Sequence, residues 1–237
     1  MNSFGSQKKI VPGGLLIAIE GIDGGGKTTL ADALLHSFES AGVRVHKSKE
    51  PTFGPWGMKV RNGNAEGRLD AEEEVRYLIL DRQQHVNEVI KPELSLGGVV
   101  ILDRYYPSTA AYQGAAGQDV DRLLEMNSFA PVPDVIFVLD IDPATGLDRI
   151  RGRGDVPNIF ETTETLTRCR ELFLSMPLSS RRVIDASGTV ESVLREAWKV
   201  LLVVIADKAA ALRGFSPEAA DLVLDIGGAI PNLDWGN

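Results

Sequence analysis

The sequence predicts an α/β fold in which a five-stranded parallel sheet carries helices on both faces. Apolar runs typical of buried strands alternate with amphipathic helical runs, which is the pattern of a parallel sheet covered on both sides. Each predicted strand also ends at an acidic residue, namely Glu20, Glu50, Asp103, Asp140 or Asp185. Because the carboxyl ends of parallel strands meet at one edge of a sheet, a ligand site is expected there.

Composition indicates one large globular domain. The chain has 237 residues, 43% of them hydrophobic, which is enough to bury a substantial core. Its net charge of −8, with scattered lysines and arginines, argues against a nucleic-acid polymer as a partner. Cys169 is the only cysteine, so an internal disulfide is excluded and a cytoplasmic location is expected. The start of the chain lacks the apolar stretch of a signal peptide, and the longest apolar run, 200–206, is too short to span a membrane.

The first 92 residues predict two strands and two helices behind a polar arm, with a short helix after a loop that contains Pro51, Gly54, Pro55 and Gly57. Residues 1–13 are expected to form this arm, which is poorly ordered, and the domain is expected to span 14–212. The predicted elements are a strand over 15–20, a helix over 29–40, a strand over 43–49 and a helix over 71–90 that Pro92 ends or kinks.

The rest of the chain continues the alternation of strands and helices and contains a candidate lid. Glycines, a proline and alternating charge over 152–157 predict a mobile loop, so that 150–162 is a candidate lid. Residues 106–113 are predicted to be a loop or short helix, and the tail 213–237 has no assigned role. The other predicted elements are strands over 99–103, 135–140 and 182–185, and helices over 120–129, 143–151, 161–174 and 190–211.

Residues 21–28 read GIDGGGKT and fit the phosphate-binding pattern G-x-x-x-x-G-K-[ST]. The pattern follows a predicted strand and opens a predicted helix, as its function requires. Glycines let the backbone amides turn inward towards phosphate oxygens, and the helix start adds free N–H groups and a positive dipole end. Lys27 then reaches the β- and γ-phosphates, and the Thr28 hydroxyl is a ligand for Mg²⁺. The sequence therefore predicts a P-loop NTPase fold that binds a nucleoside triphosphate.

Asp103 and Arg104 form a second candidate cluster. Asp103 follows four β-branched or leucine residues, the pattern of the strand whose acid holds Mg²⁺ or its water beside a phosphate loop. Arg104 emerges at the same edge, and its guanidinium is suited to bidentate contact with a second phosphate. Arg82, on the predicted helix 71–90, is a candidate for the same crevice.

Three arginines, Arg149, Arg151 and Arg153, flank Gly152 at the candidate lid. On a helix Arg149 and Arg153 share a face, whereas Arg151 points away. Such side chains can swing over a triphosphate as a loop closes and stabilise charge on the transferring phosphoryl group. At least one of them is predicted to be catalytic, and the alternative is a solvated basic helix end.

Collinear segments over residues 14–205 together resemble the thymidylate kinase family. They are the phosphate loop with Thr29, then Lys49-Glu50-Pro51, Asp103-Arg104-Tyr105, the especially specific 107–114 (PSTAAYQG), Pro133-Asp134-Val135, and the arginine-rich segment after Asp142-Pro143. Gly25 stands where some members carry a loop arginine, so the resemblance is to the bacterial type in which lid arginines act. It implies transfer of the ATP γ-phosphate to dTMP, giving dTDP, with Mg²⁺. It also implies a homodimer formed through helices on one face of the sheet.

The resemblance assigns a role to each matching residue at the ATP side of the site. The implied catalytic residues are Lys27, Asp103, Arg104, Arg149, Arg151 and Arg153, and the implied metal ligands are Thr28 and Asp103. The implied ATP-binding residues are Gly21, Asp23, Gly24, Gly25, Gly26, Lys27, Thr28 and Thr29, with 186–189 bordering adenine.

The resemblance also implies an acceptor site. Arg104 would bind the acceptor phosphate, Arg82 a thymine carbonyl, and Asp23 would lie near the 3′-hydroxyl. Thr109 and Gln113 would line the base and sugar pocket, with Tyr112 crowding the 2′ position against ribose. The full implied set is Asp23, Glu50, Pro51, Leu78, Arg82, Arg104, Thr109, Tyr112 and Gln113.

Two departures from the family pattern bear on the acceptor. Leu78 stands where the family usually has a phenylalanine that stacks on the base, a contact worth ~1 kcal/mol, and Tyr77 or Tyr105 are candidates to replace it. Thr52-Phe53 stand where bacterial members often have two glycines.

Three functions therefore stay open: a kinase for dTMP, a kinase for another deoxynucleoside monophosphate, and a relative that binds nucleotide without turnover. A switch GTPase is disfavoured, because the chain has no Asn-Lys pair to begin the guanine-binding motif Asn-Lys-x-Asp.

Overall fold

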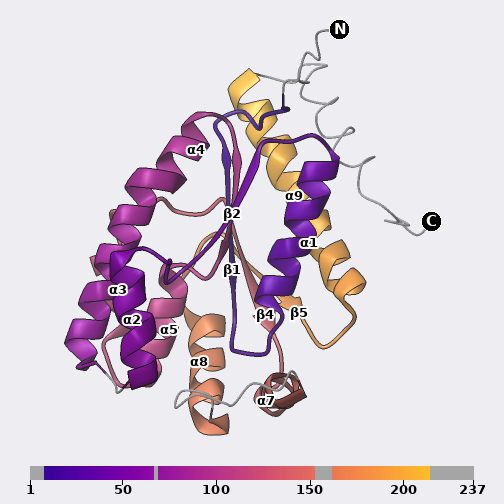
Figure 1. Ribbon diagram of the computed structural model, residues 1–237. Helices are drawn as coiled ribbons and strands as arrows, with labels where there is room; N and C mark the ends of the chain where they lie inside the picture. Colours follow the sequence, from indigo (N-terminus) through magenta and orange to yellow (C-terminus); the bar gives the residue numbers. More distant parts are fainter. Residues whose placement is uncertain (1–7, 67–68, 153–161, 214–237) are drawn as a thin grey trace, which may run out of the picture.

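Five parallel strands form one sheet at the centre of the described residues (Figure 1). The computed structural model describes residues 8–66, 69–152 and 162–213. The strands are β1 (Leu15–Glu20), β2 (Val45–Lys49), β3 (Val99–Asp103), β4 (Val135–Asp140) and β5 (Arg181–Asp185). They lie in the order β2-β3-β1-β4-β5, and every neighbouring pair is parallel. The predicted α/β sheet of five parallel strands is confirmed.

Helices cover both faces of this sheet, as predicted (Figure 1). One face carries α1 and α9, which contact each other, and the other carries α3, α5 and α8. The helices are α1 (Lys27–Ser40), α2 (Pro55–Glu66), α3 (Ala71–His85), the π-helix η1 (Val86–Ile90), α4 (Lys91–Ser95), α5 (Tyr106–Ala115), α6 (Val120–Met126), α7 (Pro143–Gly152), α8 (Thr163–Ser175) and α9 (Val190–Arg213). Among the helices so described, none is long and apolar enough to cross a membrane.

The central strand β1 is buried along its whole length. Ile17 pairs with Ile101 of β3 on one side and with Val135 of β4 on the other. Helices also cover both faces, so an unbroken apolar run is what this position requires. On the α1 face, the ring of Trp198 lies 4.9 Å from that of Phe38, and both side chains are fully buried. The phosphate loop thus begins at a strand that is fully buried and paired on both sides.

The strand ends form the edge where the predicted acids gather. Glu20, Asp103, Asp140 and Asp185 are the last residues of their strands, and Glu50 directly follows β2. The chain leaves β1 towards β3 and β2, then returns to the opposite side of β1 with β4. Open α/β sheets bind ligands outside the carboxyl ends at such a reversal.

The long helix predicted to end or kink at Pro92 does not end there. After α3 the chain makes the π-helical turn η1, and α4 then runs through Pro92 to Ser95. The N–H of Lys91 bonds to the carbonyl of Val86, five residues back, which places the widened turn just before the proline. Pro92 lies in the first turn of α4, where its missing N–H costs little. Residues 106–113, predicted to be a loop or short helix, belong to α5.

Part of the expected N-terminal arm is packed against the sheet. Lys9 forms a parallel bridge with Val43, and the N–H of Val11 donates to the carbonyl of Gly97 at 2.8 Å. Val11 is fully buried, and burial of this apolar side chain holds 8–13 on the body. Residues 1–7, the lid stretch 153–161 and the tail 214–237 lie outside the described residues.

Candidate active site

The phosphate loop turns sharply between β1 and α1. Gly24 and Gly26 have φ angles of 78° and 87°, in the left-handed region that glycine adopts without strain. At Gly24 a Cβ would also collide with the backbone of Gly146 in α7. The Lys27 side chain is buried, and its Nζ donates to the carbonyl of Ile22 at 2.7 Å. Burial, assisted by the positive charge of Arg104, lowers the pKa of Lys27 to about 8.

Asp103 lies beside the start of α1, as the motif predicted. The Thr28 hydroxyl donates to Asp103 Oδ2 at 2.5 Å, and Lys49 Nζ lies 3.2 Å from the same oxygen. Oδ1 is buried and has no hydrogen-bond partner in the described structure. Burial alone would raise the pKa of Asp103, but the charge of Lys49 and the Thr28 hydrogen bond lower it overall. A carboxylate with one free oxygen next to a hydroxyl is a donor set that suits Mg²⁺.

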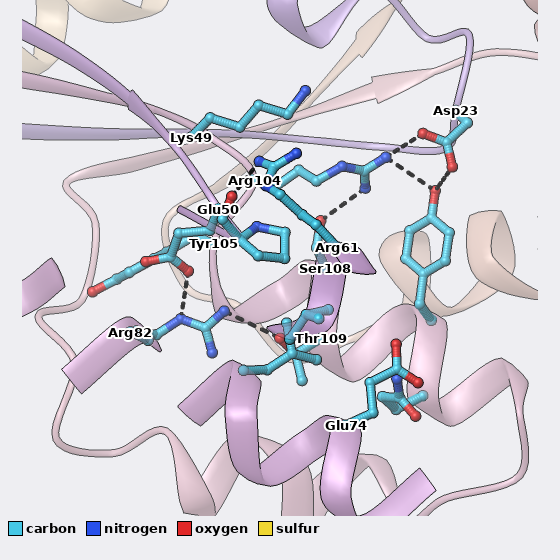
Figure 2. A pocket seen from close by; sticks show the side chains of 15 residues that line it. Asp23, Lys49, Glu50, Arg61, Glu74, Arg82, Arg104, Tyr105, Ser108 and Thr109 are labelled. Atoms are coloured by element: carbon cyan, nitrogen blue, oxygen red, sulfur yellow. Dashed lines mark hydrogen bonds and ion pairs between the residues drawn. The ribbon is translucent and has the colours of Figure 1, made fainter. Parts of the chain in front are cut away.

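Arg104 joins the end of β3 to the phosphate loop. Its Nη2 donates to Asp23 and lies 3.4 Å from the Tyr112 hydroxyl, while Nη1 donates to Ser108 at 3.2 Å (Figure 2). The Tyr112 hydroxyl in turn donates to Asp23 at 2.8 Å. Arg104 has a φ of 74°, an uncommon value for a residue with a side chain, and such outliers cluster at functional sites. The charges of Arg104 and Lys27 overcome the effect of burial and lower the pKa of Asp23 to about 2.

A cavity of about 280 Å³ opens beside Arg104 and is called the Arg104 cavity below (Figure 2). All nine residues predicted to bind the acceptor line it, although they come from five separate segments of the chain: Asp23, Glu50, Pro51, Leu78, Arg82, Arg104, Thr109, Tyr112 and Gln113. The remaining lining residues are Lys49, Val60, Arg61, Glu74, Tyr105 and Ser108. The predicted acceptor set is therefore one continuous wall.

Arg82 is held rigidly in that wall. Its Nε donates to Glu50 at 2.7 Å, its Nη2 donates to Thr109 at 3.1 Å, and its Nη1 donates to Asn127. The other Glu50 oxygen lies 2.9 Å from His85 Nδ1. All of these side chains are buried, and a buried ionic network of this kind fixes the direction of each member.

Neither tyrosine proposed as a replacement for the missing phenylalanine has a free ring. Tyr77 stacks on Trp56 at 5.9 Å and does not line the Arg104 cavity. Tyr105 lines it, but its ring is fully buried and lies 5.0 Å from that of Tyr106. Leu78 itself lines the cavity, so the position of the family's stacking ring is occupied by an aliphatic side chain.

A second cavity, about 430 Å³, lies beside the phosphate loop and is called the loop cavity below. Gly24, Gly25, Gly26 and Thr29 line it together with Ala186, Gly188 and Thr189, which belong to the segment 186–189 predicted to border adenine. Gly21, Asp23, Lys27 and Thr28 belong to the same loop and helix start but are not among its lining residues.

The three lid arginines are placed differently from one another. Arg149 lines the loop cavity, and its Nη2 donates to the carbonyl of Ala186 at 3.0 Å. Arg151 is exposed and pairs with Asp148 at 3.4 Å. Arg153 lies outside the described residues. Arg149 is thus the one of the three that the described structure brings to a cavity.

Two polar residues of the Arg104 cavity were missed by the sequence reasoning. Arg61 of α2 donates to the carbonyls of Pro51 and Thr52, and nothing in its local sequence distinguishes it from a surface arginine. Glu74 of α3 had a usable signal, because Glu74, Leu78 and Arg82 are spaced four residues apart and share one helix face.

The phosphate loop and the cation-lined Arg104 cavity lie at the same edge of the sheet. This arrangement defines a P-loop kinase for a small phosphorylated acceptor. The family model described as thymidylate kinase matches residues 19–197. The chain belongs to the thymidylate kinase family.

Close relatives support the same assignment. A thymidylate kinase of Xanthomonas oryzae pv. oryzae (strain PXO99A) is 56% identical over 200 residues, covering 84% of this chain and 88% of that protein. One from Xanthomonas campestris pv. campestris (strain B100) matches with the same identity and coverage. One from Xylella fastidiosa (strain M12) is 53% identical over 204 residues, covering 86% of this chain and 94% of its own length.

Proposed function

We propose that this protein transfers the γ-phosphate of ATP to dTMP, giving dTDP. The observation that carries the proposal is the Asp23–Arg104 pair, which links the phosphate loop to the Arg104 cavity. A donor phosphate on the loop and an acceptor phosphate at Arg104 would then lie next to each other at the carboxyl edge of the sheet. Alignment of two phosphates and neutralisation of their charge account for most of the catalysis in phosphoryl transfer.

In this proposal the chain's own cations do the electrostatic work. Lys27 leaves the carbonyl of Ile22 for the β- and γ-phosphates, because a phosphate anion is the stronger acceptor. Arg104 gives up one of its hydrogen bonds within the protein and binds the acceptor phosphate instead. Asp23 and Tyr112 keep its guanidinium group oriented. Arg149, which lines the loop cavity, and Arg151 and Arg153 are the lid candidates for stabilising the transferring group.

Mg²⁺ is the proposed cofactor. Thr28 and Asp103 would hold it, since the Asp103 Oδ1 atom has no partner within 8–66, 69–152 and 162–213, and the Thr28 hydroxyl lies next to the same carboxylate. Mg²⁺ is bound in such enzymes by one or two side-chain oxygens together with substrate phosphates. When bound, it would neutralise charge on the phosphate oxygens.

The test is a coupled assay of ADP release across dTMP, dUMP, dCMP and dGMP, beside ATP alone. We expect dTMP to give the highest kcat/KM, and no turnover with dTMP above ATP alone would contradict the proposal. Arg104→Ala should raise KM for dTMP while leaving KM for ATP within about twofold, since Arg104 serves the acceptor. Tight ATP binding with no dTMP binding in a parallel titration would instead identify a relative without turnover.

We also propose a homodimer in the cytoplasm. The resemblance supports the dimer, and so does a groove along α3 and α6 whose apolar members include Val75, Ile79, Leu80, Leu123 and Met126. Light scattering during size-exclusion chromatography tests it, and Ile79→Glu should shift the mass towards that of one chain. A single mass of about 26 kDa for the unaltered protein would contradict the dimer.

A further inference from the structure

Glu74 has an unusual environment for a carboxylate. It lies in the first turn of α3, is 4% exposed and lines the Arg104 cavity. Its Oε2 atom has no hydrogen-bond partner among the described residues. A buried acceptor without a partner is costly, and such groups in enzymes are commonly completed by a ligand. Figure 2 shows the carboxylate pointing from its helix into the space that the other lining side chains face.

The helix brings Glu74 to the same wall as Arg82. Glu74, Leu78 and Arg82 are successive i, i+4 neighbours on one face of α3, and all three line the Arg104 cavity. The carboxylate and the guanidinium are therefore held by one rigid element. Leu78 lies between them along the helix and supplies an apolar surface.

Residues with hydrogen-bond donors line the same cavity as this acceptor. Arg82 has five N–H groups, of which three donate to Glu50, Thr109 and Asn127. Gln113 lines the cavity, and its Oε1 accepts a 3.1 Å hydrogen bond from Gln118, so its amide nitrogen is the end left to act as a donor. The cavity thus combines cationic and amide side chains with a carboxylate oxygen that has no partner in the described part of the chain.

We propose that Glu74 accepts the N3–H of a pyrimidine imide, the edge shared by thymine and uracil. The proposal rests on the proposed function, since it places the acceptor base in the Arg104 cavity. An imide presents a carbonyl, an N–H and a second carbonyl, which complement a donor, an acceptor and a donor. Cytosine has a lone pair at N3 instead, and the Glu74 carboxylate repels it. Glu74 is then a residue that selects the base, acting beside Arg82.

The test compares Glu74→Ala and Glu74→Gln with the unaltered enzyme, using dTMP, dUMP and dCMP at saturating ATP. Loss of a charge-assisted hydrogen bond should lower kcat/KM for dTMP and dUMP about 10- to 100-fold in Glu74→Ala, mainly through KM. Glu74→Gln, which keeps an acceptor oxygen, should recover part of that loss. KM for ATP and kcat/KM for dCMP should not fall. The matched control is Glu73→Ala, which removes an exposed carboxylate from the same helical turn outside the cavity.

A dTMP analogue methylated at N3 gives a second arm that needs no variant. The unaltered enzyme should use it at least 10-fold less well than dTMP, and Glu74→Ala should narrow that ratio. Equal use of both compounds, or a KM for dTMP within twofold of normal in Glu74→Ala, would overturn the role of Glu74. Failure of the unaltered enzyme to turn over dTMP would contradict the proposed function itself, so the two failures are distinct.

Discussion

The Thr28 hydroxyl donates a 2.5 Å hydrogen bond to Asp103, and this bond ties the phosphate loop to the end of strand β3. Strand register brings the two together, because Ile19, the last but one residue of β1, lies opposite Asp103. Lys49, on the far side of β3, reaches the same carboxylate from β2. Three strand ends thus converge on the carboxylate proposed to hold Mg²⁺.

Replacement of that carboxylate should abolish most of the catalysis. We expect Asp103→Asn to lower kcat about 100-fold or more and to raise the Mg²⁺ concentration needed for half-maximal rate, since an amide is a weaker ligand than a carboxylate. The measurement is kcat over a Mg²⁺ titration. The matched control is Asp32→Asn, an exposed position paired with Lys47, which should leave kcat unchanged. A normal Mg²⁺ dependence in Asp103→Asn would remove this residue from the metal site.

The pKa of Lys27 predicts an alkaline limit on ATP capture. Burial and the charge of Arg104 lower this pKa to about 8, so the free enzyme carries the ammonium below pH 8 and loses it above. Because kcat/KM reports ionisations of the free enzyme, kcat/KM for ATP should fall as pH rises through about 8. Lys27→Ala should lose phosphoryl transfer at every pH while keeping its thermal midpoint. A profile that stays flat to pH 9.5 would show that Lys27 does not titrate in this range.

Glu20 should make stability depend on pH below neutrality. Burial raises its pKa to about 7, outweighing its hydrogen bonds from Ser108 and Tyr105. The folded state therefore binds a proton that the unfolded state releases near pH 4.5, and the free energy of unfolding falls as pH rises from about 4.5 to 7. A shift of this size is worth about 3 kcal/mol.

Urea unfolding at pH 5 and pH 8 measures this effect of Glu20. Glu20→Gln should show a smaller loss between the two pH values than the unaltered protein. Glu39→Gln, at an exposed position of α1, is the control and should change nothing. An identical pH dependence in the Glu20 variant would rule Glu20 out as its source.

An aromatic ring at position 78 should tighten acceptor binding. Leu78 lines the Arg104 cavity, and a stacking ring adds ~1 kcal/mol beyond the area that it buries. Leu78→Phe should therefore lower KM for dTMP about fivefold, with KM for ATP unchanged. Steady-state kinetics with varied dTMP measure it, and Leu96→Phe at a half-exposed site outside the cavity is the control. A raised KM would mean that the cavity is already filled at this position.

Sequence patterns were most reliable where a single local feature imposes the structure. The mostly apolar run 15–20 has the composition of a buried strand and forms one, and glycines at 24 and 26 meet a backbone geometry that other residues resist. Pro92 shows the limit of such rules, because a π-helical turn before it lets the helix continue. Val11 shows another, since it is fully buried and its N–H donates to the carbonyl of Gly97, which is distant in sequence.

The sequence by itself determined the parallel α/β sheet, the phosphate loop and the family, because these depend on short motifs and on the alternation of strand and helix. The tertiary structure decided which side chains share a cavity. Arg61 and Glu74 line the Arg104 cavity, and Arg149 donates to the carbonyl of Ala186, through contacts between distant segments. Such contacts depend on how helices pack across the edge of the sheet, which no local pattern of residues encodes.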